Sequence, residues 1–188
     1  EALGEKYRYD ARHARAVAQL ATQLFDQLQE EHGLSRRDRL LLEVTALLHD
    51  IGLFVGLRAH HKHAQYLISA SEIFGLTRDD KDVIANMARY HRRALPQRSH
   101  LPYIALDRQD RVRVNKLAAI LRVANALDAE HAQKIRSIKV RREDDSWVLD
   151  VDGIGDLSLE RMASEARADL LLDVFGKRLL VRGAGVQT

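Results

Sequence analysis

Apolar residues recur at three- and four-residue steps through the first two thirds of the chain, and this spacing predicts helices. Ser35 with Asp38 and Thr77 with Asp80 resemble capping boxes, which start helices. Gly52 is expected to stop the helix that the first of these boxes begins. The expected helices cover Asp10 to about Glu31, Ser35 to His49, His61 to about Ser71, Thr77 to His91, and about Asp107 to Asp128.

The pattern changes after about His131, where alternation replaces the helical spacing. Two alternating runs, around Ile138 to Val140 and from Trp147 to Val151, flank the turn-prone sequence EDDS and predict a β-hairpin. The remaining expected elements are a short strand at Leu157 to Leu159, a helix from about Met162 to Phe175, and a strand at Arg178 to Val181. The sequence therefore predicts a mainly α protein, with a helical domain at residues 1–134 and a small α+β lobe at residues 135–188.

Composition narrows the class of protein. The 188 residues are 46% hydrophobic, enough for a real core, and 30 Lys and Arg against 27 Asp and Glu give a net charge of +3. This balance is not typical of a general nucleic-acid binder. The absence of cysteine excludes disulfides, thiolate zinc sites and cysteine nucleophiles. No membrane-length apolar run or signal-like segment is present, so we expect a cytoplasmic protein. The chain begins at Glu1, which is typical of a piece of a longer protein.

Polar side chains interrupt the apolar stripes at a few places. The stretch ALLHDIG ends a buried helix with His49 and Asp50, an ionisable pair that is costly to bury unless something pairs or coordinates it. His13 shares the apolar stripe of the first helix, and Asn125 and Asp128 continue that of the last long helix. Further imidazoles come from His60, His61, His63 and His91. Such donors suit a divalent ion: Mn²⁺, Fe²⁺, Co²⁺, Ni²⁺ or Zn²⁺, with Mg²⁺ where oxygen dominates.

Ordinary explanations exist for each residue taken alone. A histidine on an apolar face, such as His13, is more often a hydrogen-bonded core residue than a ligand, and the HHKH cluster resembles an exposed loop. His32, His100 and His131 have no supporting pattern, and we expect them to be solvated. The combination of an HD pair at a helix end with His13 and a polar break in a later stripe nevertheless favours a metal-type site.

Four motifs in order carry a family resemblance: ALLHDIG, HHKHAQYLI, ARYHRRALP and LRVANALDAEH. Together they resemble the C-terminal region of the exopolyphosphatase and guanosine-pentaphosphatase (Ppx/GppA) family, within the HD superfamily of metal-dependent phosphohydrolases. The resemblance covers nearly the whole chain and implies an HD-domain helical bundle. It implies metal binding at His13, His49 and Asp50, and a second ion in members with histidines at the places of His60 or His61 and His91. It also implies upstream actin-like ATPase-fold domains in a full-length protein, and it favours a homodimer of that protein.

One position departs from the family pattern. The last ligand of the superfamily is usually an aspartate, and Asn125 stands at that place. An amide oxygen still coordinates but brings no charge, so the affinity for a divalent ion should fall. Asp128 lies one turn further along the stripe. It either reaches the site, directly or through water, or serves as a capping or salt-bridging residue.

Cations near these motifs indicate the chemistry. In a metal-dependent phosphohydrolase, Asp50, Lys62 and Arg92 would be the catalytic candidates, with the cations stabilising charge on the phosphoryl group. The segment from Arg89 to Arg113 contains seven arginines and only two aspartates. This excess of positive charge favours a groove that binds polyphosphate or a phosphorylated nucleotide. Its expected binding residues are Lys62, Arg89, Arg92, Arg93 and Arg98.

Two functions stay open at this point. The first is handling of inorganic polyphosphate or guanosine pentaphosphate with hydrolysis at the metal site. The alternative is a non-catalytic polyphosphate-binding or dimerisation module with a degenerate metal site, in which these arginines are binding or plain surface charges. DNA or RNA ranks lower, because only 5% of the residues are aromatic.

Overall fold

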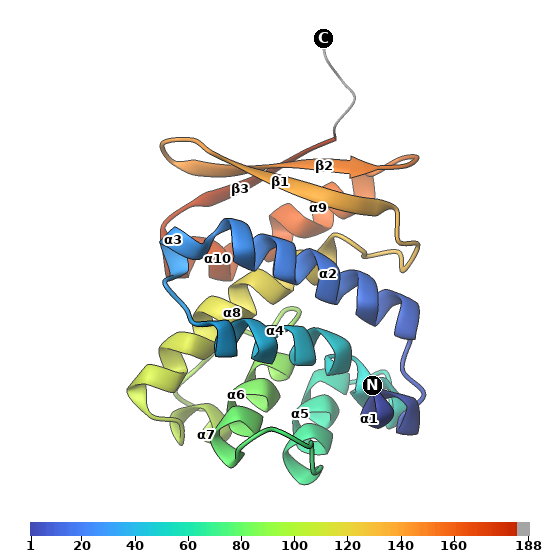
Figure 1. Ribbon diagram of the computed structural model, residues 1–188, viewed down its shortest axis with the longest axis vertical. Coiled ribbons are helices and arrows are strands. Elements are labelled where there is room, and N and C mark those ends of the chain that lie inside the picture. Colours follow the sequence, from blue (N-terminus) through green and yellow to red (C-terminus); the bar gives the residue numbers. More distant parts are fainter. Residues whose placement is uncertain (184–188) are drawn as a thin grey trace.

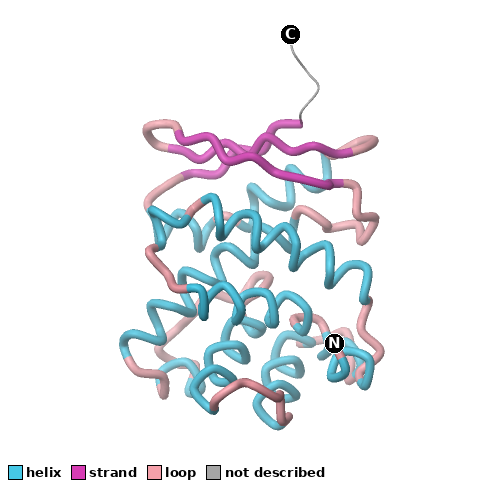
Figure 2. The backbone as a smooth tube through the Cα atoms, in the orientation of Figure 1, coloured by secondary structure: helices cyan, strands magenta, loops and turns pink. Residues whose placement is uncertain are grey.

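The computed structural model describes residues 1–183 and shows a mainly helical protein with a three-stranded sheet at one end. Figure 1 shows the helices gathered below the sheet, and Figure 2 shows the strands confined to a single layer. The fold class expected from the sequence, mainly α with a small α+β lobe, is confirmed.

The helical part runs from the N-terminus to Ala126. Its elements are α1 (Ala2–Lys6), α2 (Ala11–Gln27), α3 (Gln29–His32), α4 (Arg36–Leu48), the 3-10 helix η1 (Ile51–Phe54), α5 (His60–Ala70), α6 (Arg78–Arg89), α7 (Leu101–Ile104) and α8 (Arg108–Ala126). Both capping boxes are confirmed: Ser35 with Asp38 starts α4, and Thr77 with Asp80 starts α6. The expected single helix from Asp10 to Glu31 is interrupted, because Leu28 leaves helical geometry (φ −101°, ψ 19°) between α2 and α3.

The C-terminal part contains β1 (Ile135–Arg142), β2 (Ser146–Gly153), α9 (Ser158–Arg167), α10 (Asp169–Phe175) and β3 (Arg178–Gly183). The hairpin is confirmed: β1 and β2 pair antiparallel across the expected turn, with Val140 opposite Leu149. β3 pairs parallel with β2, and α9 and α10 make the crossover that a parallel pair needs.

Two expectations about this part are wrong. The residues Leu157 to Leu159 form no strand, because the Asp156 carboxylate accepts hydrogen bonds from the backbone N–H and hydroxyl of Ser158 and a helix starts there. Three residues of alternation are too few to separate a strand from a helix start. The helix expected from Met162 to Phe175 is two helices, broken at Ala168.

One continuous hydrophobic core joins the bundle and the sheet layer. β1 packs on α2, and α9 and α10 pack on α8. The side chain of Arg122 on α8 is 1% exposed at this junction and bonds to the Asp169 carboxylate (2.5 Å) and to the carbonyls of Tyr90 and Ala94 (3.2 and 3.1 Å). The buried guanidinium therefore fixes the chain after α6 against the start of α10. The division into two domains at residue 134 stays a prediction.

None of the helices in residues 1–183 has the length and apolar character needed to cross a bilayer. The cytoplasmic location expected from the sequence stays a prediction.

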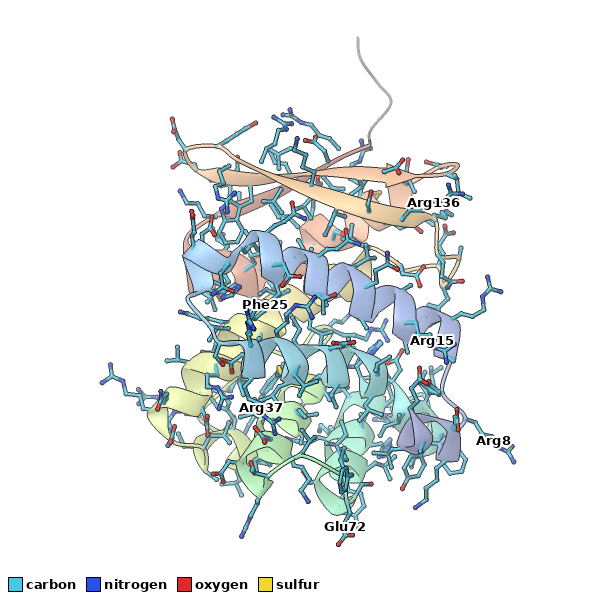
Figure 3. All side chains as sticks on the ribbon, in the orientation of Figure 1. Arg8, Arg15, Phe25, Arg37, Glu72 and Arg136 are labelled. Atoms are coloured by element: carbon cyan, nitrogen blue, oxygen red, sulfur yellow. The ribbon has the colours of Figure 1, made fainter. Side chains whose placement is uncertain are left out.

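A salt bridge between α4 and the start of α6 gives a testable pH dependence. Arg37, labelled in Figure 3, donates to the Asp80 carboxylate at 2.5 Å and holds the pKa of Asp80 at about 2, below its usual 3.8. A carboxyl whose pKa is lowered by folding stabilises the protein above its unfolded pKa and loses that contribution as the pH falls. We therefore expect the free energy of unfolding to fall between pH 4 and 2, by roughly 1 kcal/mol from this pair.

Urea titrations of the unmodified chain and of Asp80→Asn across this pH range measure the effect. The amide keeps the cap oxygen but does not titrate, so the pH dependence of the variant should be shallower. Asp79→Asn, which removes an exposed carboxylate one residue earlier, is the control and should keep the original dependence. Equal slopes for the chain and Asp80→Asn would contradict the assignment.

Candidate metal centre

The end of α4 brings two adjacent ionisable side chains to one point. α4 ends at Leu48, His49 caps it with helical torsions, and Asp50 then turns out of the helix (φ −104°, ψ 5°). Two successive residues inside a helix point about 100° apart, whereas this break lets both face the same space. The Nε2 atom of His49 lies 3.4 Å from the Asp50 Oδ2 atom.

The Asp50 carboxylate is surrounded by four imidazoles from four segments of the chain. Oδ2 faces the Nε2 atoms of His49 and of His13 on α2, the latter at 3.9 Å. Oδ1 faces the Nε2 atoms of His91, after α6, at 3.3 Å and of His60, at the start of α5, at 3.5 Å. All four histidines are buried. The structure therefore places five of the predicted site residues close together: His13, His49, Asp50, His60 and His91.

The other ring nitrogen of each imidazole faces a hydrogen-bond acceptor. The four Nδ1 contacts are His13 with the Asp128 carboxylate (2.8 Å), His49 with the Ala46 carbonyl (2.7 Å), His60 with the Leu57 carbonyl (3.1 Å) and His91 with the Ala88 carbonyl (2.6 Å). In the tautomer with the hydrogen on Nδ1, each ring donates to its acceptor. The four Nε2 lone pairs of that tautomer point at the space around Asp50.

A divalent ion fits this donor set. The Nε2 of His49 and the Oδ1 of Asp50 are buried without a hydrogen-bond partner. The Nε2 atoms of His60 and His91 face each other at 3.3 Å, an unfavourable approach of two lone pairs unless a cation or proton lies near both. Two nitrogens about 2.0–2.1 Å from one ion at the tetrahedral angle are roughly 3.3 Å apart. Within residues 1–183, two groups have ligand atoms within 4.8 Å of one another, His49 with Asp50 and His91, and His13 with Asp50 and His131.

Burial and charge set the ionisation of the cluster. Burial alone would raise the pKa of Asp50, but the adjacent His49 and His91 outweigh it and hold the pKa of this carboxyl below its usual range. Burial lowers the pKa of His91 to about 4, although Asp50 opposes the shift. Burial would lower the pKa of His49, but the adjacent Asp50 carboxylate outweighs it and raises this pKa. Near neutral pH the centre therefore presents a carboxylate and a neutral His91, whereas metal binding also requires the neutral form of His49, which its raised pKa opposes.

Asn125 and Asp128 lie on either side of His13. The Oδ1 atom of Asn125 is 3.1 Å from the Nε2 of His13 and so faces the cluster. Asp128 lies behind the ring, on Nδ1, and both its oxygens also accept hydrogen bonds from Gln133. Asp128 thus orients His13, in the way that outer carboxylates commonly hold metal-binding histidines.

A pocket of about 270 Å³ opens onto the cluster and places one of the expected cations beside it. Arg92 lines this pocket together with Asp50, His60 and Asn125. The other expected binding residues, Lys62, Arg89, Arg93 and Arg98, are not among its lining. Arg89 instead donates to Gln65 at 3.4 Å. His61 lies edge-on to His60, outside both ligand groups, and burial lowers its pKa to about 4.

Two residues that line the pocket were not predicted as site residues. Arg167, at the end of α9, lines the pocket, and burial and the nearby charges of Arg92 and Arg93 lower its pKa. His131 is exposed, as expected, but its ring also lies parallel to that of His13 with centroids 3.6 Å apart. No sequence signal marks Arg167, because only the packing of α9 on α8 brings it to the pocket.

His32 corrects a further expectation. It was expected to be solvated but is 1% exposed, and its ring bonds to the Phe25 carbonyl (2.8 Å) and to the backbone N–H of Leu34 (2.9 Å). It therefore closes the α3 turn and has no part in the cluster.

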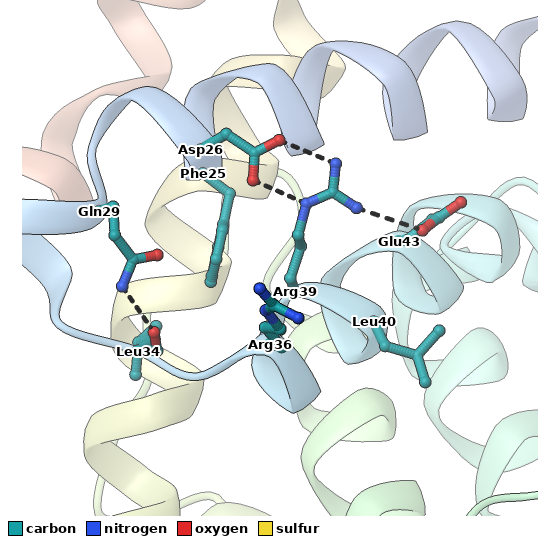
Figure 4. Close-up of a pocket in the computed structure, with 8 residues that line it drawn as sticks. All are labelled: Phe25, Asp26, Gln29, Leu34, Arg36, Arg39, Leu40 and Glu43. Atoms are coloured by element: carbon teal, nitrogen blue, oxygen red, sulfur yellow. Dashed lines mark hydrogen bonds and ion pairs between the residues drawn. The ribbon is translucent and has the colours of Figure 1, made fainter.

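Another pocket, between α2 and α4, lacks this chemistry (Figure 4). Arg39 there donates to both oxygens of Asp26 at 2.7 and 2.8 Å and lies 3.9 Å from the Glu43 carboxylate. Because these charges satisfy one another and no imidazole lines the pocket, the Asp50 cluster is the stronger candidate for function.

Comparison with known proteins finds relatives of this chain. A family model described as Ppx/GppA phosphatase, domain III, matches residues 1–158. The chain is similar to proteins named guanosine-5'-triphosphate,3'-diphosphate pyrophosphatase. With that of Photobacterium profundum it shares 31% identity over 62% of this chain and 24% of the relative. With that of Aeromonas hydrophila it shares 31% identity over 71% of this chain and 26% of the relative. The chain thus spans about a quarter of the length of these relatives.

Proposed function

The chain belongs to the Ppx/GppA phosphatase family, and on that premise we propose that it handles phosphoanions at a divalent-metal centre built around Asp50. The observation that carries this proposal is the convergence of four imidazole Nε2 atoms on one carboxylate, 3.3 to 3.9 Å from its oxygens. His13, His49, Asp50, His60 and His91 would hold the ion. Because Asp50 belongs to both groups of ligand atoms, the centre would bind either one ion or two.

An ion held by these residues would lower the pKa of a coordinated water and polarise a phosphoryl oxygen. The chain's own residues supply the rest. Arg92 and Arg167 line the pocket above Asp50 and would bind the phosphate oxygens, for which the planar guanidinium is well suited. Asp128 and the carbonyls behind the imidazoles hold the rings in place before any ligand arrives.

The substrate class we propose is a phosphorylated nucleotide or inorganic polyphosphate. The relatives' names support a guanosine 5'-triphosphate,3'-diphosphate substrate, and the arginines at the pocket suit either anion. In a full-length protein we expect actin-like ATPase-fold domains upstream and a homodimer. The chain would then contribute one phosphoanion site among others.

A non-catalytic module is the second candidate, and Asn125 is the observation that favours it. An amide at 3.1 Å from His13 replaces the carboxylate of the usual pattern and leaves the centre with less negative charge. In that case the chain binds polyphosphate or supports dimerisation without hydrolysis. Phosphate release from polyphosphate and from guanosine 5'-triphosphate,3'-diphosphate, with and without added Mn²⁺, separates the two functions.

Charge reversal at the pocket tests phosphoanion binding. In Arg92→Glu with Arg93→Glu, a cation that lines the pocket and the cation next to it in the chain become anions, so we expect the Kd for polyphosphate at moderate salt to rise at least about tenfold, or ~1.4 kcal/mol. Titration of labelled polyphosphate monitored by fluorescence anisotropy measures the change.

The matched control is Arg78→Glu with Arg136→Glu, which changes the net charge equally at exposed sites on α6 and β1 (Arg136 is labelled in Figure 3). It should weaken binding far less. Equal weakening in both double variants would show a general charge effect and would count against the pocket.

A further inference from the structure

We propose that His131 is an additional metal ligand, which supplies a donor to the side of the centre that Asn125 leaves without a carboxylate. This inference rests on the proposed function, because it concerns the same ion. It also narrows the cofactor class, since an added imidazole favours Fe²⁺, Co²⁺, Ni²⁺ or Zn²⁺ over Mg²⁺.

The position of the ring is the first observation. The imidazoles of His131 and His13 are stacked, with centroids 3.6 Å apart and an interplanar angle of 8°. One ring nitrogen of His131 lies within 4.8 Å of a nitrogen of His13 and of an Asp50 oxygen. His131 also lines the same pocket as Asp50 and Asn125. The ring is therefore at the open side of the cluster, where His13, Asp50 and Asn125 meet.

The hydrogen bonding of the ring is the second observation. The Nδ1 atom of His131 lies 3.1 Å from the Asp10 carboxylate, which leaves Nε2 as the free donor atom. Asp10 is itself held, because its other oxygen caps α2 by accepting from the backbone N–H groups of Arg12 and His13, each at 3.1 Å. A carboxylate on the far nitrogen is the usual support of a metal-binding histidine. His13 has the same support from Asp128.

The backbone that carries the ring is the third observation. His131 and Gln133 both adopt left-handed torsions (φ 55° and 49°), which are unfavourable for residues other than glycine. Asp128 holds this turn: its backbone carbonyl accepts from the His131 N–H at 3.0 Å, and its side chain accepts from the Gln133 N–H at 2.7 Å. One residue thus fixes both the His13 ring and the loop that lays His131 against it. Strain maintained in this way is typical of functional sites.

A direct test is Co²⁺ binding by the metal-free chain, followed by calorimetry and by the visible absorption of the ion, which reports its ligands. We expect His131→Ala to weaken Co²⁺ binding at least about tenfold and to change the absorption spectrum. His131→Gln, whose amide can still donate to Asp10 but offers no imidazole nitrogen, should weaken Co²⁺ binding and change the spectrum as well, which separates ligation from support of the loop. Adding Asn125→Asp to His131→Ala should restore much of the affinity.

The control is His100→Ala, which removes an imidazole that bonds to the Tyr90 hydroxyl outside both ligand groups. It should bind Co²⁺ like the unmodified chain. If His131→Ala and His131→Gln keep the original affinity and spectrum, the inference is overturned while the proposed function stands. If the unmodified chain binds no Co²⁺, both are overturned.

Discussion

Asp50→Asn is expected to abolish divalent-ion binding by the purified chain, with a loss of affinity of about 100-fold or more. The carboxylate lies between four imidazole nitrogens and supplies the negative charge among them. An amide keeps one oxygen, removes the charge, and introduces an N–H₂ group that hydrogen-bonds to the lone pairs meant for the ion. Any metal-dependent phosphate release should disappear with the ion. Isothermal titration with Mn²⁺ and Co²⁺ measures the loss.

Asp79→Asn is the matched control for this variant. It makes the same chemical change at an exposed position at the opposite end of α6 from His91 and should bind the ions normally. Both variants should keep the far-ultraviolet circular dichroism of the unmodified chain. Unchanged ion binding by Asp50→Asn would rule out this carboxylate as the centre of the site.

Gly52→Ala is expected to destabilise the protein by about 3 kcal/mol or more and to impair the same site. A Cβ atom at Gly52 would lie 2.0 Å from the carbonyl oxygen of His60 and 2.4 Å from the backbone nitrogen of Ala64. Both are backbone atoms of the first turn of α5, so the clash cannot be relieved by a side-chain rotation. α5 would have to move away from η1 and carry His60 away from Asp50. Urea unfolding measures the stability, and Co²⁺ titration measures the site.

Gly56→Ala provides the comparison. A Cβ at Gly56 meets no atom within 4 Å, and the glycine lies only four residues later in the same loop region. It should lose little stability and bind the ion normally. If Gly52→Ala matched Gly56→Ala in both measurements, the close approach of η1 to α5 would not be a requirement of the fold.

Local chemistry made much of this fold and site predictable. The capping boxes at Ser35 and Thr77 depend on side chains three residues apart, and the hairpin depends on alternation around a polar turn, so both can be recognised in the sequence. The HD pair was recognisable for a similar reason, because a charged pair at the end of an apolar helix needs a partner.

Other features depend on packing between distant segments and were not predictable. Gly52 was expected only to stop a helix, yet its role is to let α5 approach, which no local pattern shows. Arg167 reaches the pocket because α9 packs on α8, beyond residue 158, where the family match ends. His131 is exposed, as its loop position predicts, but its stacking on His13 was not predictable, because it depends on two left-handed residues and on the carboxylate of Asp10, which caps α2.

The central claim, that Asp50 and the surrounding imidazoles bind a divalent ion, is tested most directly by metal analysis. The chain would be equilibrated with Mn²⁺, Fe²⁺, Co²⁺, Ni²⁺ and Zn²⁺, desalted, and analysed by inductively coupled plasma mass spectrometry beside Asp50→Asn. We predict close to one or two ions per unmodified chain and almost none in the variant. A metal-free unmodified chain, or equal metal content in the two proteins, would contradict the claim.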